Sequence, residues 1–156
     1  MNEDNLHFDR RGTPRMVDVS GKGVTLRTAV ARGGIQLGDS NLEALGLSKK
    51  GPVQTTAALA GIQAAKRAWE LIPLCHALPL EKVEITFDLQ DQCLWCRCAV
   101  AGEAKTGYEM EALVGVSVAL LTVYDMLKAA GKGMVIREVK LVEKTGGKSG
   151  AWRCEQ

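Results

Sequence analysis

The stretch Lys82–Val100, KVEITFDLQDQCLWCRCAV, decides the fold. Its first half alternates apolar and polar residues, with the apolar ones at Val83, Ile85, Phe87 and Leu89. That alternation is typical of a strand that buries one face. The polar pair Asp91-Gln92 leads into a second alternating run, CLWCRCAV. The sequence therefore predicts a β-hairpin in the middle of the chain.

Helical patterns lie on both sides of this hairpin. The segment QTTAALAGIQAAKRAWELI, residues 54–72, is rich in alanine and other good helix formers, and Pro73 closes it. After the hairpin, Thr106 and Glu109 form the pattern T-x-x-E, a capping box that predicts the start of a second helix. The helical pattern then continues until two glycines stop it, Gly131 and Gly133.

Two further strands complete the order. The segment Thr25–Leu37 has β-branched residues around a Gly33-Gly34 break, which predicts a strand with a bulge or bend, and residues 38–49 are expected to form a polar loop. The last strand is expected over Arg137–Glu143. The order β-α-β-β-α-β predicts an α+β, ferredoxin-like fold, with an antiparallel sheet and helices packed on one face.

The composition is that of one globular domain. With 156 residues, 46% hydrophobic and 24% charged, the chain is long enough for one sizeable core. Twenty basic and 18 acidic residues give a net charge of +2, so the charge balance does not indicate nucleic-acid binding. We expect residues 1–20 to form a flexible arm and residues 21–156 a single domain.

No segment predicts export or membrane insertion. The longest apolar run, Ala112–Val123, is interrupted by Gly and Ser and falls short of a membrane span. The first fifteen residues are mostly polar, unlike a signal peptide. A cytoplasmic location is therefore expected, with the five cysteines present as reduced thiols.

Three of these cysteines are clustered, at Cys93, Cys96 and Cys98. One interpretation is half of a zinc site. The other is strand alternation, which places Cys93 on one face and Cys96 and Cys98 on the opposite face. The spacing favours the strand, because no second paired cluster follows, and we expect no metal site.

Asp125 and Lys128 are the first candidates for chemistry. They lie three residues apart on the second predicted helix and so share a face. Glu111 precedes Asp125 by fourteen residues, close to four helical turns, and is expected near the same stripe. A carboxylate beside an ammonium group can exchange protons with a substrate. Spacing alone favours the alternative, an exposed ion pair.

The segment LIPLCHALPL supplies two more candidates. His76 is either a general acid or base or a core histidine, and Cys75 is either a nucleophile or a small buried residue. Three lysines, Lys50, Lys66 and Lys144, would bind a polyphosphate if the fold brought them together.

A loop rich in glycine, KTGGKSG, spans Lys144–Gly150. It ends like a P-loop, but Val142 stands where that pattern requires a glycine. It is not a P-loop. Its backbone N–H groups and lysines can still bind an anion.

Several of these stretches together resemble one family. The motifs are MVDVS, AGIQAAK, LIPLCH, GYEMEAL, YDMLKA and KTGGKSG, in order from Met16 to Gly150. They resemble the cyclic pyranopterin monophosphate synthases, the molybdenum cofactor biosynthesis protein C family. This resemblance implies a ferredoxin-like lyase that converts 3′,8-cyclo-7,8-dihydroguanosine 5′-triphosphate to cyclic pyranopterin monophosphate and releases pyrophosphate.

The resemblance also implies the assembly and the site. It implies a homohexamer, a trimer of dimers with active sites at subunit interfaces, and no cofactor beyond Mg²⁺ that can accompany the triphosphate. It assigns catalysis to Asp125, Lys128 and Lys50. It assigns substrate binding to Leu74, Cys75, His76, Glu109, Met110, Glu111, Lys66 and Lys144. Our own hypothesis is that KTGGKSG is a mobile basic lid, whose Lys144 contacts the triphosphate while its glycines allow it to close. The rival classes are a non-catalytic anion-binding module and a zinc-binding interaction domain.

Overall fold

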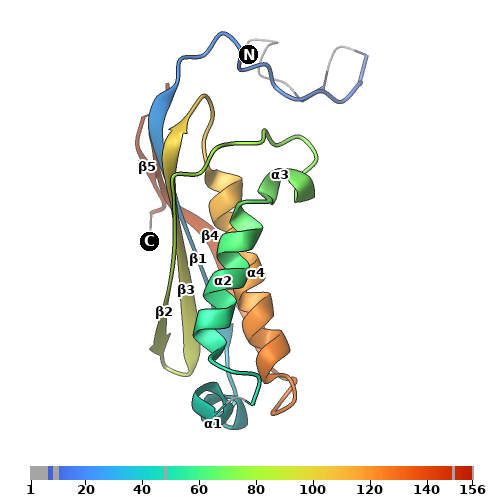
Figure 1. Cartoon of the computed structure of the whole chain (residues 1–156), viewed down its shortest axis with the longest axis vertical. Helices are drawn as coiled ribbons and strands as arrows, with labels where there is room; N and C mark the ends of the chain where they lie inside the picture. Colours follow the sequence, from blue (N-terminus) through green and yellow to red (C-terminus); the bar gives the residue numbers. More distant parts are fainter. Residues whose placement is uncertain (1–6, 9–10, 48, 149, 156) are drawn as a thin grey trace.

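The computed structural model describes residues 7–8, 11–47, 49–148 and 150–155. Five antiparallel strands form one sheet in the order β2-β3-β1-β4-β5, and α2 and α4 cover one face of it (Figure 1). The predicted ferredoxin-like α+β fold is confirmed. The elements are β1 (Thr25–Gln36), α1 (Asp39–Leu47), α2 (Val53–Ala65), α3 (Ala68–Leu71), β2 (Lys82–Gln90), β3 (Cys93–Ala104), α4 (Glu109–Leu127), β4 (Val135–Thr145) and β5 (Trp152–Arg153).

The central hairpin forms as predicted. Strands β2 and β3 pair from Lys82 with Ala101 to Gln90 with Cys93. The two turn residues both have positive φ, 48° at Asp91 and 61° at Gln92. Positive φ at both central residues defines the two-residue turn that matches the twist of the flanking strands.

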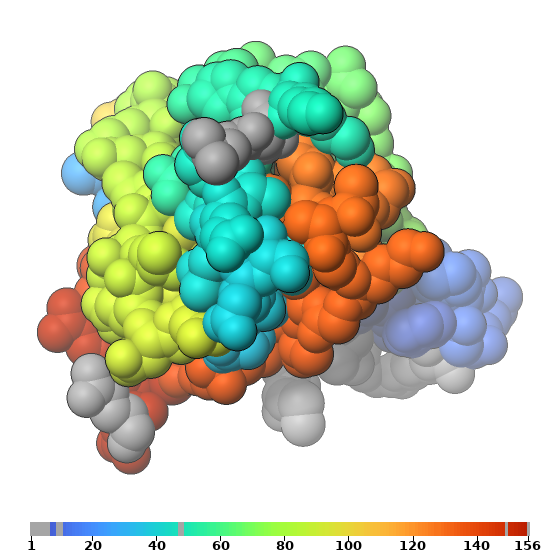
Figure 2. Space-filling view, turned by 90° about the horizontal axis from the view of Figure 1, so that it is seen from below, coloured from blue at the N-terminus to red at the C-terminus, as the bar shows by residue number. Residues whose placement is uncertain are grey.

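Three predicted elements differ from the structure. Residues 38–49, expected to be a loop, contain α1, whose buried Asn41 donates through Nδ2 to Leu127 O and Gly131 O, both at 3.1 Å. Tertiary hydrogen bonds thus hold a helix that has no strong pattern of its own. The helix expected over residues 54–72 is broken at Lys66-Arg67 into α2 and α3, and the short strand β5 was not predicted. Figure 2 shows α1 between the β2–β3 turn and the segment after α4.

The core lies between the sheet and the two long helices. Its largest members include Ile35, Leu94, Leu120 and Leu127, all at most 1% exposed. Helices α2 and α4 cross closely at Gly61, where an added Cβ would lie 2.7 Å from the carbonyl oxygen of Gly115. Helix α4 is long and apolar enough to cross a membrane, but 56% of that stretch is buried in the protein, as expected for a core helix.

The clustered cysteines alternate across strand β3, as the strand interpretation predicted. Cys93 faces the outer side of the sheet, whereas Cys96 and Cys98 pair with Gly33 and Ala31 and face the helices. Burial raises the pKa of both Cys96 and Cys98 to about 12, so they are protonated thiols at neutral pH. The three sulfur atoms therefore do not converge on one point. No group of three or more His, Cys, Asp or Glu side chains within the described ranges is placed to hold a metal ion.

Candidate active site

One cavity of ≈ 220 Å³ lies at the N-terminal end of α4. Six of the predicted substrate-binding residues line it, namely Leu74, Cys75, His76, Glu109, Met110 and Glu111. The first three come from the segment between α3 and β2, and the others from the first turn of α4. The fold thus brings together two motifs that are more than thirty residues apart in the sequence.

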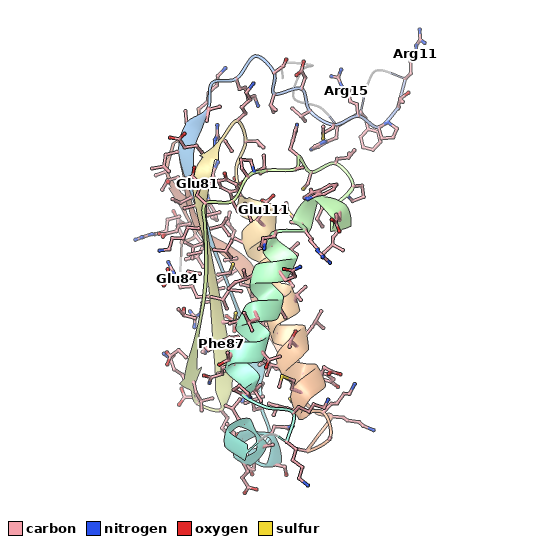
Figure 3. All side chains as sticks on the ribbon, viewed as in Figure 1. Arg11, Arg15, Glu81, Glu84, Phe87 and Glu111 are labelled. Atoms are coloured by element: carbon pink, nitrogen blue, oxygen red, sulfur yellow. The ribbon has the colours of Figure 1, made fainter. Side chains whose placement is uncertain are left out.

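Glu111 is the most perturbed carboxyl group at this cavity. It is only 4% exposed, and Figure 3 shows it at the N-terminal end of α4. Desolvation by burial raises its pKa to about 7, against an opposing hydrogen bond from its own backbone, and the charge of Glu109 raises it further. A carboxyl group with a pKa near neutrality can either give or accept a proton at physiological pH.

Glu109 does not form the predicted capping box. The N-cap residue of α4 is Tyr108, which makes no side-chain capping bond. The Glu109 carboxylate instead forms an ion pair with Lys144 of β4, at 3.6 Å, and both side chains are half-buried. Tyr108 anchors this end of α4 because the hydroxyl of this buried side chain donates a hydrogen bond to Pro79 O at 2.7 Å. Lys144, a predicted site residue, therefore lies beside the cavity.

His76 joins the cavity to the N-terminal segment, residues 11–20. Its Nε2 lies 2.8 Å from Val17 O, and since a carbonyl oxygen only accepts, Nε2 donates the proton. Val17 and Val19 also line the cavity. Burial, with a smaller effect from Glu111, raises the pKa of the Cys75 thiol. Cys75 is therefore protonated at neutral pH, which does not favour a nucleophile.

A second cluster lies at the C-terminal end of α4. The Asp125 carboxylate accepts a hydrogen bond from Lys128 Nζ at 2.5 Å and another from Lys50 Nζ at 3.4 Å. Lys50 also donates to Asp125 O at 2.9 Å. The hydrogen bond and charge of Lys128, with those of Lys50, lower the pKa of Asp125, and Asp125 in turn raises the pKa of Lys128. The three predicted catalytic residues thus meet in one exposed ion-pair cluster.

The two clusters do not meet within one chain. Glu111 and Asp125 are fourteen residues apart on α4, which is about 21 Å along a helix. Fourteen residues are close to four helical turns, so both lie near one stripe of the unbroken helix α4, as predicted, but Glu111 is buried whereas the Asp125 side chain is 59% exposed. The three lysines also do not converge: Lys50 lies with Asp125, whereas Lys144 lies with Glu109.

Lys66 is the remaining predicted substrate-binding residue. It is the exposed C-cap residue of α2, whose end lies toward the N-terminal end of α4 (Figure 1). It does not line the ≈ 220 Å³ cavity.

Several residues at the two clusters were not predicted. His7, Val17, Val19, Lys22 and Thr106 also line the cavity, and Asn41 holds the end of α4 that carries Asp125. Spacing gives no site signal for them: Thr106 stood out only as part of the T-x-x-E pattern, and the others reach their places through tertiary contact. Only the motif MVDVS, which contains Val17 and Val19, contributed to the family resemblance.

The fold and these clusters define a ferredoxin-like domain with an acid–base group in a cavity and an ion-pair cluster of one carboxylate and two lysines. The profile of the MoaC family matches residues 16–147. The chain belongs to the MoaC family. It is 53% identical over 153 residues to a cyclic pyranopterin monophosphate synthase of Thermomicrobium roseum, covering 96% of this chain and 92% of the relative. It is 50% identical over 155 residues to one of Novosphingobium aromaticivorans, covering 98% and 99%.

Proposed function

We propose that this chain is a lyase that converts 3′,8-cyclo-7,8-dihydroguanosine 5′-triphosphate to cyclic pyranopterin monophosphate, with release of pyrophosphate, in molybdenum cofactor biosynthesis. Two relatives of nearly equal length are named cyclic pyranopterin monophosphate synthase. The observation that carries the proposal is one cavity lined by seven residues of the LIPLCH and GYEMEAL motifs. It supplies an acid–base group, Glu111, and an adjacent cation, Lys144.

Within a single chain, the cavity that contains Glu111 offers too little space for this substrate. The ≈ 220 Å³ cavity is smaller than the roughly 300–1,000 Å³ of typical ligand pockets. The Asp125 cluster is far from it and exposed to solvent. Both facts support a site completed by a second copy of the chain.

We infer a two-fold arrangement in which the α4 helices of two copies run antiparallel. A two-fold axis places the same patch of each copy against the other. The C-terminal end of one α4, with Asp125, then lies near the Glu111 cavity of the partner. Exposed Leu59 and Leu121, at 65% and 56%, give α2 and α4 apolar surface for such a contact. We propose that these dimers associate further into a hexamer, a trimer of dimers.

The charges at the two clusters fit the steps that the reaction requires. Closing the cyclic phosphate forms a bond from a sugar hydroxyl to the α-phosphorus and breaks the bond to the β-phosphate, which leaves as pyrophosphate. We propose that Asp125 accepts protons and Lys128 donates them during rearrangement of the ring. Lys50, Lys66 and Lys144 hold the phosphates and stabilise the charge that develops on the leaving group.

The KTGGKSG loop is proposed to close over the bound triphosphate. Gly146 and Gly147 have positive φ, 91° and 75°, which side chains rarely adopt. An added Cβ on Gly147 would lie 2.4 Å from an Arg27 nitrogen, so the loop already packs on β1. Ser149 of this loop lies outside the described residues. A Lys144→Gln variant is expected to raise the Kd of the substrate, and an unchanged Kd would remove Lys144 from binding.

The remaining expectations concern the setting of the reaction. We propose a cytoplasmic location and no resident cofactor, with Mg²⁺, where it takes part, entering together with the triphosphate. Magnesium usually binds through phosphates and one or two carboxylates, which is compatible with this route. The proposed flexible arm of residues 1–20 and the single catalytic domain of residues 21–156 stay predictions.

The test is to supply the purified protein with the cyclised guanosine triphosphate and to assay pyrophosphate and cyclic pyranopterin monophosphate. Asp125→Asn is expected to lower turnover by roughly 100-fold or more, since it removes a general base. Asp88→Asn is the matched control, because Asp88 is exposed on strand β2. Binding of the substrate without product by the native chain would instead support a non-catalytic binding module. Full turnover by Asp125→Asn would remove Asp125 from the mechanism.

A further inference from the structure

The outer face of the sheet, opposite the helices, carries a row of three cations. In the register of the strands, Arg97 of β3 pairs directly with Arg32 of β1, and Arg32 pairs directly with Lys140 of β4. Like charges directly opposite one another on neighbouring strands destabilise a sheet. We call Arg32, Arg97 and Lys140 the cation row.

The nearby carboxylates make their short ion pairs with other cations, and Arg97 acts on Glu84 only as the last of several causes that lower the pKa of that carboxyl. On the same face, Glu143 is paired with Arg153 at 2.6 Å and Glu84 with Lys82 at 2.9 Å. Figure 3 shows Glu84 on strand β2. Among the residues that the structure describes, no carboxylate lies within 4.0 Å of a charged nitrogen of the cation row.

Arg32 is held in place by an aromatic ring instead of an anion. Its guanidinium carbon lies 3.8 Å from the centroid of the Trp95 ring, and that of Arg137 lies 5.7 Å from the same centroid. Trp95 is the β3 residue opposite Gly34, where an added Cβ would come within 2.9 Å of the ring. The ring therefore lies flat on the sheet beside the cation row and presents Arg32 in a fixed position.

A cavity of ≈ 490 Å³ lies against the cation row. All three cations line it, and Val30, only 5% exposed, is among the apolar residues at its base. Arg153 also lines it, together with two carboxylates, Glu143 and Glu155, so cations outnumber carboxylates four to two. A concave surface with an excess of positive charge and planar guanidinium groups matches an anion with several oxygens.

We propose that the cation row binds a multivalent phosphate anion, such as pyrophosphate or a longer oligophosphate. The anion accepts hydrogen bonds from Arg97 and Lys140 and offsets the repulsion between directly opposed cations. This site is separate from the Glu111 cavity, because the sheet lies between them. It does not depend on the proposed function, since it needs neither Glu111 nor Asp125.

The test uses Trp95 as a local probe. The chain has three tryptophans, so a Trp69→Phe/Trp152→Phe variant reports on Trp95 alone. Inorganic pyrophosphate, added at constant ionic strength, is expected to change the emission of Trp95 in a saturable way. Arg97→Gln and Lys140→Gln in this background are expected to raise the Kd roughly tenfold or more, since each removes a charged hydrogen-bond donor. Lys132→Gln is the matched control, because it removes one charge from an exposed position after α4.

A second measurement does not depend on the double variant. In the otherwise native chain without phosphate, Arg97→Gln is expected to raise Tm, because it relieves repulsion within the row. Pyrophosphate is expected to raise the Tm of the native chain and of the control Lys132→Gln. It is expected not to raise the Tm of Arg97→Gln.

Three results would overturn the proposal. The first is a Trp95 emission that does not change up to millimolar pyrophosphate, and the second is an equal response in Arg97→Gln and Lys132→Gln. The third is a change in oligomeric mass caused by Arg97→Gln, together with a native chain that does not respond to pyrophosphate. That result would place carboxylates of a second copy, and not a small anion, against the row.

Discussion

The native chain is expected to lose stability as the pH rises from 4.5 to 7, because of Glu111, and the variant Glu111→Gln is expected not to show this loss. Burial raises the pKa of Glu111 from an ordinary value of 4.5 to about 7. Below pH 4.5 the carboxyl is protonated in both the folded and the unfolded chain, so the shift has no effect on stability. Between pH 4.5 and 7 the unfolded chain releases the proton first, and the folded state becomes less stable by about 3 kcal/mol. Glutamine has no proton to release and avoids this loss.

The assay is guanidinium unfolding at pH 5 and pH 8, at one protein concentration and ionic strength. The free energy of unfolding of Glu111→Gln, relative to that of the native chain, is expected to increase by about 2 to 3 kcal/mol between these pH values, because a small part of the loss is already present at pH 5. Glu103→Gln is the matched control, because Glu103 is exposed on strand β3, and its difference should stay constant. Turnover of Glu111→Gln should fall roughly 100-fold. A stability difference that does not change with pH would refute the perturbed pKa.

Two further substitutions test how the fold positions the site. Gly61→Ala is expected to lower the free energy of unfolding by about 1–3 kcal/mol, because the new Cβ would lie 2.3 Å from Ile85 Cδ1. Gly46→Ala is the control: its new Cβ would have no atom within 4 Å, so this variant should not be destabilised. Asn41→Ala is expected to cost about 1–3 kcal/mol, because it leaves two carbonyls at the end of α4 without their donor, and to lower kcat by displacing Lys128. Denaturant unfolding measures the stability of both variants, and steady-state kinetics measures kcat of Asn41→Ala. A kcat equal to the native value would exclude a role for Asn41 in positioning Lys128.

Local patterns in the sequence were sufficient for most of the sheet. The alternation of apolar residues predicted β2, where Val83, Ile85 and Phe87 are half-buried as expected although Leu89 is exposed, and the cysteine alternation predicted β3. These signals are readable because side chains on a strand with one buried face must alternate. Helix α1 was missed because the bonds that hold it, from Asn41 to the end of α4, join residues 86 and 90 positions apart.

The site shows the same division between local and tertiary information. Spacing correctly placed Asp125 beside Lys128, since residues three apart on a helix are neighbours. It could not bring Lys50 to Asp125 across 75 residues, nor Val17 to His76 across 59. Those pairings came from the family resemblance or from the structure. The capping-box prediction is wrong because the N-cap residue is Tyr108 and Glu109 pairs with Lys144, which the sequence places 35 residues away on strand β4.

The central claim is that each active site combines the Asp125 end of one chain with the Glu111 cavity of another. The most direct measurement is synthase activity after co-expression of Asp125→Asn and Glu111→Gln chains under two affinity tags, each variant being inactive alone. In a mixed dimer one of the two shared sites keeps both native residues, so the mixture should recover about a quarter of the native activity. Mixed oligomers that isolate with both tags yet show no activity above the separate variants would contradict the shared site.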